Sequence, residues 1–585
     1  MLTTVVHVTH EVVQKIGGIG AVLQGLLTAP TYAAAVPRNI LVGPLFSADG
    51  PAADRLGSGG EVLYSSLDGR TDHPQSPQLA AVERRYNVHI VYGRKVFTDP
   101  FTGASCRPEA LLIQVHQYDK ARIDLFKWRL FERFGIASNQ YEWIWDYEQY
   151  CRIAEPAIDA LLALGCGDET NPAVLLAHEY MGMPTALAAM LNAPTRFRTI
   201  FHAHETAPVR RLVESHPGHD ITFYNALTLA QPRNLTIHDV FGSQKSFYKY
   251  PLVEAAKFCD NIFAVGDLVA EELRFLDHAF SPHPIDLAYN GVPAARISLN
   301  EKLLSRRRLR RYSLDLLGYE PDFIFTHVTR LVLSKGLWRD IRVMEQLDPL
   351  LRSSGQTAVL LVLSTETSPR PAAAIQSMES AYHWPVAHRE GYPDLTGGEA
   401  AYYTGVQEFN ARARQSRIIF INQFGFDAQA CGSRVPPNMN FTDLRHGSDV
   451  EFGQSIYEPF GIAQLEPLAF GALCVLTRQC GCAGFVRRLI GASASVNILE
   501  VDYTPLPAPQ NTLETLLALD ASARVQIETN VAAAVAAEIY RRLPRTERQV
   551  AALLDTGYSL ASRMSWDAVA RDYVLPGITR ALQRR

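Results

Sequence analysis

The sequence predicts an α/β protein built on two doubly wound parallel sheets that follow one another along the chain. At the N-terminus, a β-rich run at residues 3–9 precedes a glycine-containing loop and a helical stretch at residues 21–27. Further short apolar runs alternate with helical stretches, and the whole pattern restarts at residues 322–328. Such alternation is typical of open parallel sheets with helices on both faces.

The first half of the chain contains further runs that we interpret as buried strands. They lie at residues 39–42, 89–91, 173–177, 198–202 and 261–265. In the second half, the strand at residues 322–328 precedes a helix from about Gly336, whose apolar residues recur at helical spacing. The remaining strands are expected at residues 358–364, 418–422, 449–452 and 473–477.

The two sheets are expected to join near residues 293–321, and residues 365–417 look like an insertion. The join carries a cluster of arginines, which we interpret as the solvated face of a helix; a polyanion or phosphate-effector site is the alternative. The cluster consists of Arg306, Arg307, Arg308, Arg310 and Arg311.

Composition excludes several classes of protein. The chain has 585 residues, of which 47% are hydrophobic and 20% charged, so it is not mainly disordered or fibrous. Its 56 basic and 60 acidic residues give a net charge of −4, which argues against a general nucleic-acid binder. Eight cysteines are too sparse for a disulfide scaffold. Without a signal peptide or an apolar run of about 18 residues, a cytoplasmic protein with no membrane span is expected.

The glycine loop reads Lys15-Ile-Gly-Gly-Ile-Gly20. Glycines after a strand let a ligand approach the backbone, and the N-terminus of the following helix favours an anion. A dinucleotide site would also need an acid near the end of the second strand, about 20 residues on. That strand ends Ile40-Leu-Val-Gly-Pro44, which argues against NAD or FAD. A tight turn with only a packing role is the alternative.

Two histidines follow one another closely at the end of a predicted strand, in the segment Phe201-His-Ala-His-Glu205. Sheets of this class bind their ligands at that end. On an extended strand His202 and His204 would share a face, whereas Glu205 would point away. We therefore favour a polar cluster that binds sugar over a metal site, and expect no metal. His178-Glu179 ends another strand in the same way, with less support.

Two further motifs lie in the second sheet. Arg330 and Lys335 occupy the loop after the strand at residues 322–328, where two cations near a helix N-terminus can clamp a diphosphate. Glu458 and Glu466 belong to Glu458-Pro-Phe-Gly-Ile-Ala-Gln-Leu-Glu466. Pro459 suits a first helical position, so Glu458 is expected at a helix start and Glu466 about 12 Å along the axis. The alternatives are purely structural: Arg330 and Lys335 would be solvated surface cations, and Glu458 would only cap a helix on which Glu466 is solvated.

Taken together, these segments resemble a glycogen or starch synthase, among the retaining nucleotide-sugar glycosyltransferases of the GT-B fold. The resemblance covers nearly the whole chain in the family's order. Its motifs are the loop at Lys15, Phe201-His-Ala-His204, Phe263-Ala-Val-Gly-Asp-Leu-Val-Ala-Glu271, Tyr289-Asn-Gly-Val-Pro293, Arg330 to Gly336, Ser455-Ile-Tyr-Glu-Pro-Phe-Gly to Glu466, and Ser565-Trp566 to Tyr573.

The resemblance implies two Rossmann-like domains facing a central cleft: residues 1–295 on the acceptor side, residues 296–563 binding the nucleotide sugar, and a terminal helix, 564–585, returning to the first domain. It implies retaining transfer of glucose from ADP- or UDP-glucose to an oligo- or polysaccharide, as in glycogen biosynthesis, without a cofactor. The catalytic residues would be His204, Arg330, Lys335 and Glu458. The donor-binding residues would be Lys15, Gly17, Gly18, Tyr457, Gly461, Glu466 and Gly481.

One stretch departs from the family pattern. Where the family usually has T-G-G-L-x-[DE], this chain has Gln479-Cys-Gly-Cys-Ala-Gly484. Two alternatives to a glycogen or starch synthase therefore stay open. One is another retaining GT-B enzyme, such as a mannosyltransferase, a sucrose-type synthase or a phosphorylase, although a phosphorylase's lysine motif is not visible. The other is a non-catalytic glucan-binding or regulatory protein, which Cys480 and Gly484 favour.

Overall fold

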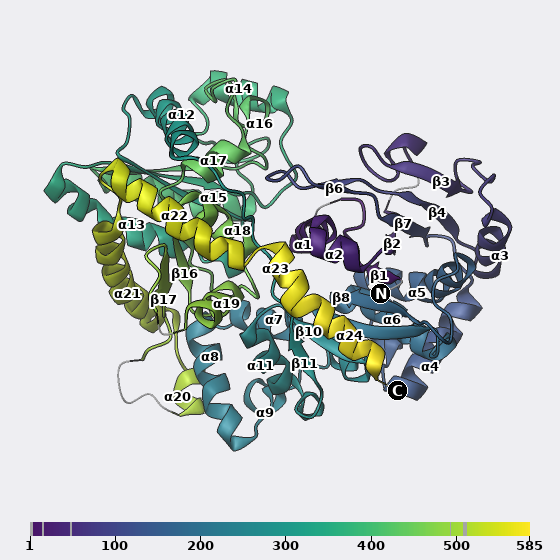
Figure 1. The fold of residues 1–585 in the computed structure, drawn as a ribbon. Coiled ribbons are helices and arrows are strands. Elements are labelled where there is room, and N and C mark those ends of the chain that lie inside the picture. The colour runs from purple at the N-terminus through teal and green to yellow at the C-terminus, as the bar shows by residue number, and fades with distance from the viewer. Residues whose placement is uncertain (1–3, 15–16, 47–48, 492, 507–511, 585) are drawn as a thin grey trace. The chain divides into compact units, whose positions relative to one another are not determined.

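The chain forms two compact units, each composed of separate stretches of sequence. The computed structural model describes residues 4–14, 17–46, 49–491, 493–506 and 512–584 (Figure 1). Unit 1 comprises Met1–Val209, Ala230–Gly291 and Trp566–Arg585, and unit 2 comprises Arg210–Leu229 and Val292–Ser565.

Unit 1 is built on a mixed sheet of nine strands within the described residues, in the order β11-β10-β9-β8-β1-β2-β7-β4-β3. All neighbours are parallel except that β4 runs antiparallel to both β7 and β3. A separate short hairpin pairs β5 (Phe97–Thr98) with β6 (Ser105–Cys106). The sheet strands are β1 (Val5–Val8), β2 (Asn39–Pro44), β3 (Glu61–Ser65), β4 (His89–Arg94), β7 (Glu109–Gln114), β8 (Ala173–His178), β9 (Phe197–Ala203), β10 (Asn261–Ala264) and β11 (Ile285–Leu287).

Helices connect these strands, and the end of the chain adds two more. The helix α24 lies beside β10 and β11 (Figure 1), where the Asn261 side-chain amide donates to the Gly577 carbonyl over 3.2 Å. The helices are α1 (Gly18–Thr28), α2 (Pro30–Ala35), α3 (Ser76–Tyr86), α4 (Lys120–Phe134), α5 (Trp145–Ala163), α6 (Glu179–Asn192), α9 (Ile237–Phe241), α10 (Tyr250–Glu254), α11 (Asp267–Leu276), α23 (Trp566–Val569) and α24 (Leu575–Gln583).

Unit 2 is built on a parallel sheet of six strands within the described residues, in the order β14-β13-β12-β15-β16-β17. Apolar side chains on its two faces form two separate buried clusters. Its strands are β12 (Phe323–Val328), β13 (Ala358–Leu363), β14 (Ser416–Ile421), β15 (Val450–Gly453), β16 (Leu473–Thr477) and β17 (Ile498–Val501). Its helices are α8 (His219–Ala230), α12 (Leu299–Leu317), α13 (Leu337–Ser354), α14 (Ala372–Tyr382), α15 (Gly397–Arg412), α16 (Ala428–Cys431), α17 (Phe441–Gly447), α18 (Ile462–Leu465), α19 (Gly481–Ile490), α20 (Leu513–Leu517), α21 (Ala521–Arg542) and α22 (Glu547–Arg563), while α7 (Ala207–Ser215) crosses the boundary between the units.

The predicted strands are confirmed, with small differences at their ends. Sequence reasoning missed β3, β7, β11 and β17 of the two sheets, together with the hairpin of β5 and β6. The prediction of wholly parallel sheets is wrong in unit 1 because of β4. The expected insertion at residues 365–417 contains α14 and α15. Since α15 packs on the parallel pair β13 and β14, this segment is an ordinary crossover of the doubly wound sheet, lengthened by α14.

The arginine cluster lies on α12, and three of its members form ion pairs inside unit 2. One of them, the exposed Arg311, pairs with Asp315 of the same helix over 3.0 Å. The Arg306 guanidinium is 3.1 Å from the Asp449 carboxylate, and that of Arg308 is 2.9 Å from Asp443. Asp449 is 1% exposed, so at least this arginine serves the packing of α12 against the sheet rather than a solvated surface. Among the described residues, no helix has the length and apolar character needed to span a membrane.

The helix α8 ties a distant stretch of sequence into the core of unit 2. The Arg339 guanidinium lies 2.7 Å from Asp220 on α8 and 2.9 Å from Glu528 on α21. All three side chains are completely buried, and the guanidinium also stacks 3.9 Å above the ring of Tyr503. Burial raises the pKa of Asp220 despite its arginine partner. Within the described part of the chain, Asp220 thus pairs with Arg339 alone, whereas Glu528 also lies 3.4 Å from the partly exposed Arg342.

We predict that Arg339→Ala destabilises unit 2 strongly. The change leaves the buried Asp220 carboxylate without its counter-charge and leaves Glu528 with Arg342 alone, 3.4 Å away. Removing one partner of a buried ion pair typically costs about 3–5 kcal/mol. The exposed pair of Arg412 and Glu345, 3.0 Å apart, offers a matched control, because Arg412→Ala should change stability by at most about 1 kcal/mol. Urea unfolding of both variants measures the difference. Equal destabilisation by the two changes would contradict a special role for the buried cluster.

Candidate active site

In unit 2, the loops after two neighbouring strands bring opposite charges into contact. The strands β12 and β15 are parallel partners, so the loops that follow them leave the same edge of the sheet. The Lys335 ammonium, in the first loop, forms an ion pair with the Glu458 carboxylate in the second. Their side chains are 17% and 13% exposed, and Arg330 nearby in sequence is exposed. The structure thus brings together two of the residues that the sequence selects.

Backbone geometry fixes these two loops against each other. The Ser334 carbonyl accepts from the backbone amides of Ile456 and Tyr457, over 2.9 and 3.2 Å. Gly336 adopts φ = 63°, and a Cβ there would lie 2.5 Å from the Gln454 carbonyl oxygen. Only glycine fits this combination of left-handed backbone and close approach. The position of Lys335 therefore follows from the glycine beside it.

The expectation that a helix begins at Pro459 is wrong. The helix α18 begins at Ile462, after Gly461 in a left-handed conformation with φ = 95°. The carbonyls of Glu458 and Phe460 instead accept from the amides of Gly481 and Cys482, over 3.1 and 2.9 Å. These bonds to a second loop replace the bonds that a helical turn would have made. Glu458 consequently lies in a loop, and the 12 Å helical spacing to Glu466 does not apply.

Glu466 is anchored by an arginine that sequence reasoning missed. The Arg445 guanidinium is 3.1 Å from the Glu466 carboxylate and 3.0 Å from that of Glu451. Arg445 and Glu451 are completely buried, whereas the side chain of Glu466 is 18% exposed. Arg445 thus fixes the Glu466 carboxylate, while part of the Glu466 side chain remains exposed to solvent. Nothing in the local sequence distinguishes Arg445 from the other arginines of the chain.

Two helices begin at this edge of the sheet. The helix α13 starts directly after Gly336, and α19 starts at Gly481. In the part of the chain that the structure describes, no side chain caps either N-terminus, so their backbone N–H groups supply partial positive charge. The amide of Gly481 itself is used by the Glu458 carbonyl. Tyr457, another expected donor-binding residue, is 2% exposed, so its side chain belongs to the core.

In unit 1, the glycine loop leads into α1 as expected, and the Glu11 carboxylate lies against the start of this helix. Gly17 precedes the helix, which begins at Gly18, while Lys15 lies outside the described residues. The amide of Gly20 donates to the Glu11 carboxylate over 2.8 Å. Glu11 is 2% exposed, so an internal anion already occupies part of this helix N-terminus. Sequence reasoning did not foresee Glu11.

Four histidines form a stacked and hydrogen-bonded group at the ends of β1, β8 and β9. His202 and His204 share a face, as expected, with ring centroids 4.1 Å apart. His178 stands opposite His202 in the sheet, and its Nδ1 is 2.8 Å from Nε2 of His204. The Nε2 atom of His178 is 3.0 Å from Nδ1 of His7. Burial lowers the pKa of His204 to about 3 and that of His7 to about 4, so both imidazoles are neutral at pH 7.

Glu179 positions the backbone that carries His204. It begins α6 with φ = 61°, an uncommon conformation for a residue with a side chain. Its carboxylate accepts from the Glu205 amide over 2.7 Å. Burial, and then the charge of Glu205, raise the pKa of Glu179 well above its usual range. The His178-Glu179 motif thus matters more than the sequence indicated, because it contributes both an imidazole and a backbone anchor.

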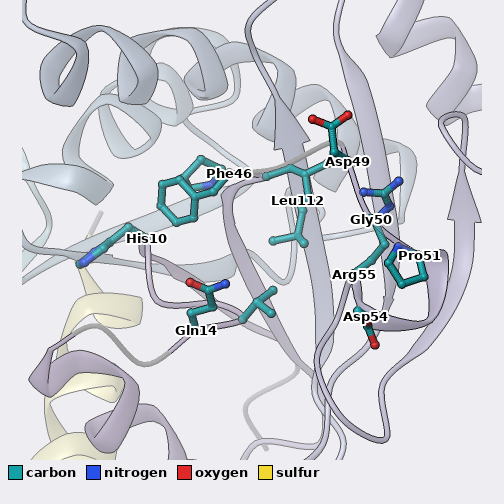
Figure 2. Close-up of a pocket in the computed structure, with 12 residues that line it drawn as sticks. His10, Gln14, Phe46, Asp49, Gly50, Pro51, Asp54, Arg55 and Leu112 are labelled. Atoms are coloured by element: carbon teal, nitrogen blue, oxygen red, sulfur yellow. The ribbon is translucent and has the colours of Figure 1, made fainter. Parts of the chain in front are cut away.

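A pocket of about 340 Å³ lies in unit 1 beyond the ends of β1 and β2. Figure 2 shows the ring of Phe46 beside it, together with the carboxylates of Asp49 and Asp54. Phe46 is 46% exposed, so part of its ring is open to the pocket. The Arg55 guanidinium also lines the pocket but is 2.9 Å from the Asp68 carboxylate. The pocket therefore combines an apolar ring face with hydrogen-bonding carboxylates. The available sequence signal was an aromatic residue two positions after the end of β2.

Comparison with solved structures shows the fold. The catalytic domain of starch synthase IV from Arabidopsis thaliana, bound to ADP and acarbose, matches at TM-score 0.51 and 14% identity, with 100% of this chain and 99% of that chain covered. An α,α-trehalose-phosphate synthase (UDP-forming) from Burkholderia xenovorans, in complex with glucose-6-phosphate, matches at 0.50 and 13%, with 98% and 100% covered.

No family model matches the sequence, and a search of curated proteins returns no match either. The likeness is therefore one of structure. Both matched proteins have the GT-B fold of retaining glycosyltransferases, and this chain has the same fold, with two Rossmann-like α/β units, as its sequence predicted.

We predict that Gly481→Ala displaces the loop that carries Glu458. A Cβ on Gly481 would lie 1.9 Å from the Pro459 carbonyl oxygen, so the loop has to move. Overpacking of this kind typically costs about 1–3 kcal/mol. Gly405→Ala is the matched control, because there the nearest atom is the flexible end of Ile341 at 3.2 Å. Thermal unfolding should show a loss for Gly481→Ala alone, and equal melting temperatures would argue against a tightly packed loop.

Proposed function

We propose that the protein is a retaining glycosyltransferase that moves a glucosyl unit from ADP- or UDP-glucose to an α-glucan or oligosaccharide, in the manner of a glycogen or starch synthase. The observation that carries the proposal is the Lys335–Glu458 pair, beside two uncapped helix N-termini at the carboxyl edge of the unit 2 sheet. On this fold, that arrangement suits an anionic donor that also carries hydroxyl groups.

In unit 2, positive charge is available for the leaving group. Arg330, Lys335 and the start of α13 would stabilise the negative charge that develops on the nucleoside diphosphate, which is often the largest catalytic contribution. Glu458 holds Lys335 in place before the donor binds. When the phosphate takes over the ammonium, the Glu458 carboxylate becomes available to the sugar hydroxyls. Glu466, held by Arg445, would bind the ribose.

In the proposed reaction, the acceptor hydroxyl attacks the anomeric carbon on the face that the phosphate leaves. The new C–O bond forms as the bond to the phosphate oxygen breaks, and the hydroxyl proton passes to that oxygen. No protein nucleophile and no metal is required. In unit 1, His204 would contact the sugar as a neutral imidazole, and the backbone amides of Gly17 and Gly18, with Lys15, would contact the donor phosphate.

The pocket beside Phe46 supports a neutral saccharide acceptor. An exposed ring face stacks on sugar rings, and the carboxylates of Asp49 and Asp54 accept hydrogen bonds from hydroxyls. A phosphorylated sugar would instead need a cation, and Arg55 is engaged with Asp68. We therefore favour a glucan over a sugar phosphate as the acceptor.

An assay with purified protein tests the proposal. Labelled ADP-glucose, UDP-glucose and GDP-mannose are each supplied with glycogen, maltooligosaccharides, fructose or glucose-6-phosphate. Glucose transfer to the glucans with retained anomeric configuration is expected. Transfer of mannose, or transfer to fructose, would favour another enzyme of the same fold. Glucan binding without any transfer would favour the non-catalytic alternative.

Substitutions in unit 2 should separate binding from chemistry. Lys335→Ala is expected to lower kcat by about 10²–10³, because a charge that stabilises the transition state is lost. Glu458→Gln should mainly lower kcat, whereas Glu466→Gln should mainly raise the KM for the donor. Lys257→Ala, which removes a surface ion pair with Glu254, is the control and should leave both constants unchanged. The opposite pattern for the two glutamates would mean that their proposed roles are exchanged.

Substitutions in the unit 1 pocket should affect the acceptor. Phe46→Ala and Asp54→Asn are each expected to raise the KM for the glucan about tenfold, the effect of losing roughly 1.4 kcal/mol, with little change in the KM for the donor. Leu125→Ala removes another exposed apolar side chain, on α4, and should have no effect. Unchanged acceptor kinetics in both pocket variants would place the acceptor elsewhere.

A further inference from the structure

Three histidine side chains of unit 1 direct ring nitrogens toward a common point. One ring nitrogen from each of His178, His202 and His204 lies within 4.8 Å of the other two. His202 is 2% exposed, and among the described residues neither of its ring nitrogens has a hydrogen-bond partner. A neutral imidazole carries one donor and one acceptor, and leaving both unmade in a buried position is unfavourable. Such a group calls for a ligand that the protein itself does not supply.

We propose that His178, His202 and His204 form a binding site for a divalent transition-metal ion of the Zn²⁺ type. Imidazole nitrogen suits zinc, copper and nickel, whereas magnesium and calcium prefer oxygen. Three histidines with one open position are a known zinc arrangement. His178 and His202 are buried and His204 is half-buried, so the open position and the entry path lie on the His204 side.

A hydrogen-bond chain behind the cluster prepares His178 as a ligand. The Asn39 amide donates to the Val36 carbonyl over 3.2 Å, which directs its Oδ1 toward the Tyr32 hydroxyl, also 3.2 Å away. The Tyr32 hydroxyl donates to that oxygen, so it accepts from Nε2–H of His7. His7 Nδ1 then accepts from Nε2–H of His178. The Nδ1 lone pair of His178 is left facing the cluster.

Metal binding would replace one hydrogen bond inside the cluster. In the unliganded protein, Nδ1 of His178 accepts from Nε2–H of His204 over 2.8 Å. The ion takes the lone pair of His178, and His204 offers its own Nε2 after its proton has moved to Nδ1. His202 contributes a nitrogen that is otherwise unsatisfied. His7 acts as a positioning residue, since partners that orient a ligating imidazole typically change metal affinity about 10–100-fold.

The site goes beyond the proposed function, because its occupation requires no nucleotide sugar. Only one consequence rests on that function: an ion bound at His204 would exclude the donor sugar and inhibit transfer. Binding is therefore measured on the protein alone. A failure to bind metal and a failure to transfer glucose are separate results.

The test uses chelator-treated full-length protein titrated with ZnCl₂ by calorimetry, and with CoCl₂ to observe the visible bands of four-coordinate cobalt. One ion per chain is expected. His202→Ala should weaken binding at least 100-fold and abolish the cobalt bands. His7→Phe should weaken binding about 10–100-fold, and His7→Gln, whose amide oxygen can accept from His178, should restore part of the affinity. His238→Ala, a half-buried histidine outside the cluster, should bind as the wild type does.

A second variant guards against misfolding. His202→Leu replaces the unsatisfied imidazole by an apolar side chain, so it should melt no lower than the wild type in the absence of metal. Zn²⁺ should then raise the melting temperature of the wild type and leave that of His202→Leu unchanged. Wild-type protein that shows no saturable binding, or His202 variants that bind Zn²⁺ as tightly as the wild type, would overturn the proposal.

Discussion

The Ser334 carbonyl is the point on which the unit 2 site depends. It binds two consecutive amides of the loop after β15, and so couples that loop to the one after β12. Lys335 follows directly, and Glu458 lies one residue beyond the second amide. The backbone therefore places Lys335 and Glu458 close together, so that little side-chain ordering is needed to form their ion pair. A preorganised charge of this kind is what a reaction with a departing anion requires.

The strand pattern was predictable because buried parallel strands are short, apolar and regularly spaced. Two of the strands that escaped notice have weaker signals, whereas β7 contains a buried apolar run, Ala110–Ile113, that sequence reasoning overlooked. The strand β11 is half-buried throughout, and β17 has two half-buried central residues, so both lack a fully apolar run. The antiparallel direction of β4 depends on its pairing with β7, which is long-range information. Local sequence does not contain it.

The sequence selects candidate site residues by their place after a predicted strand. Arg330, Lys335, Glu458 and His204 were selected in this way, and the structure brings Lys335 and Glu458 into contact. Glu11, Arg445 and His178 gain their roles from partners distant in sequence, so spacing could not single them out. Pro459 misled because proline favours a first helical turn. Gly461 and the bonds to the loop at Gly481 prevail over that local preference.

The helix α8 belongs to unit 2 but lies between two segments of unit 1 in the sequence, and this affects the order in which the units can fold during synthesis. Asp220 leaves the ribosome more than 300 residues before Glu528, yet both carboxylates share the guanidinium of Arg339. The core of unit 2 is therefore incomplete until Glu528 has been made. The packing of unit 1 is completed later still, because Trp566 packs against Gly25 and Gly291. Neither unit corresponds to a contiguous fragment, so unit 2 completes its core only after Glu528 has been made, and unit 1 only after Trp566.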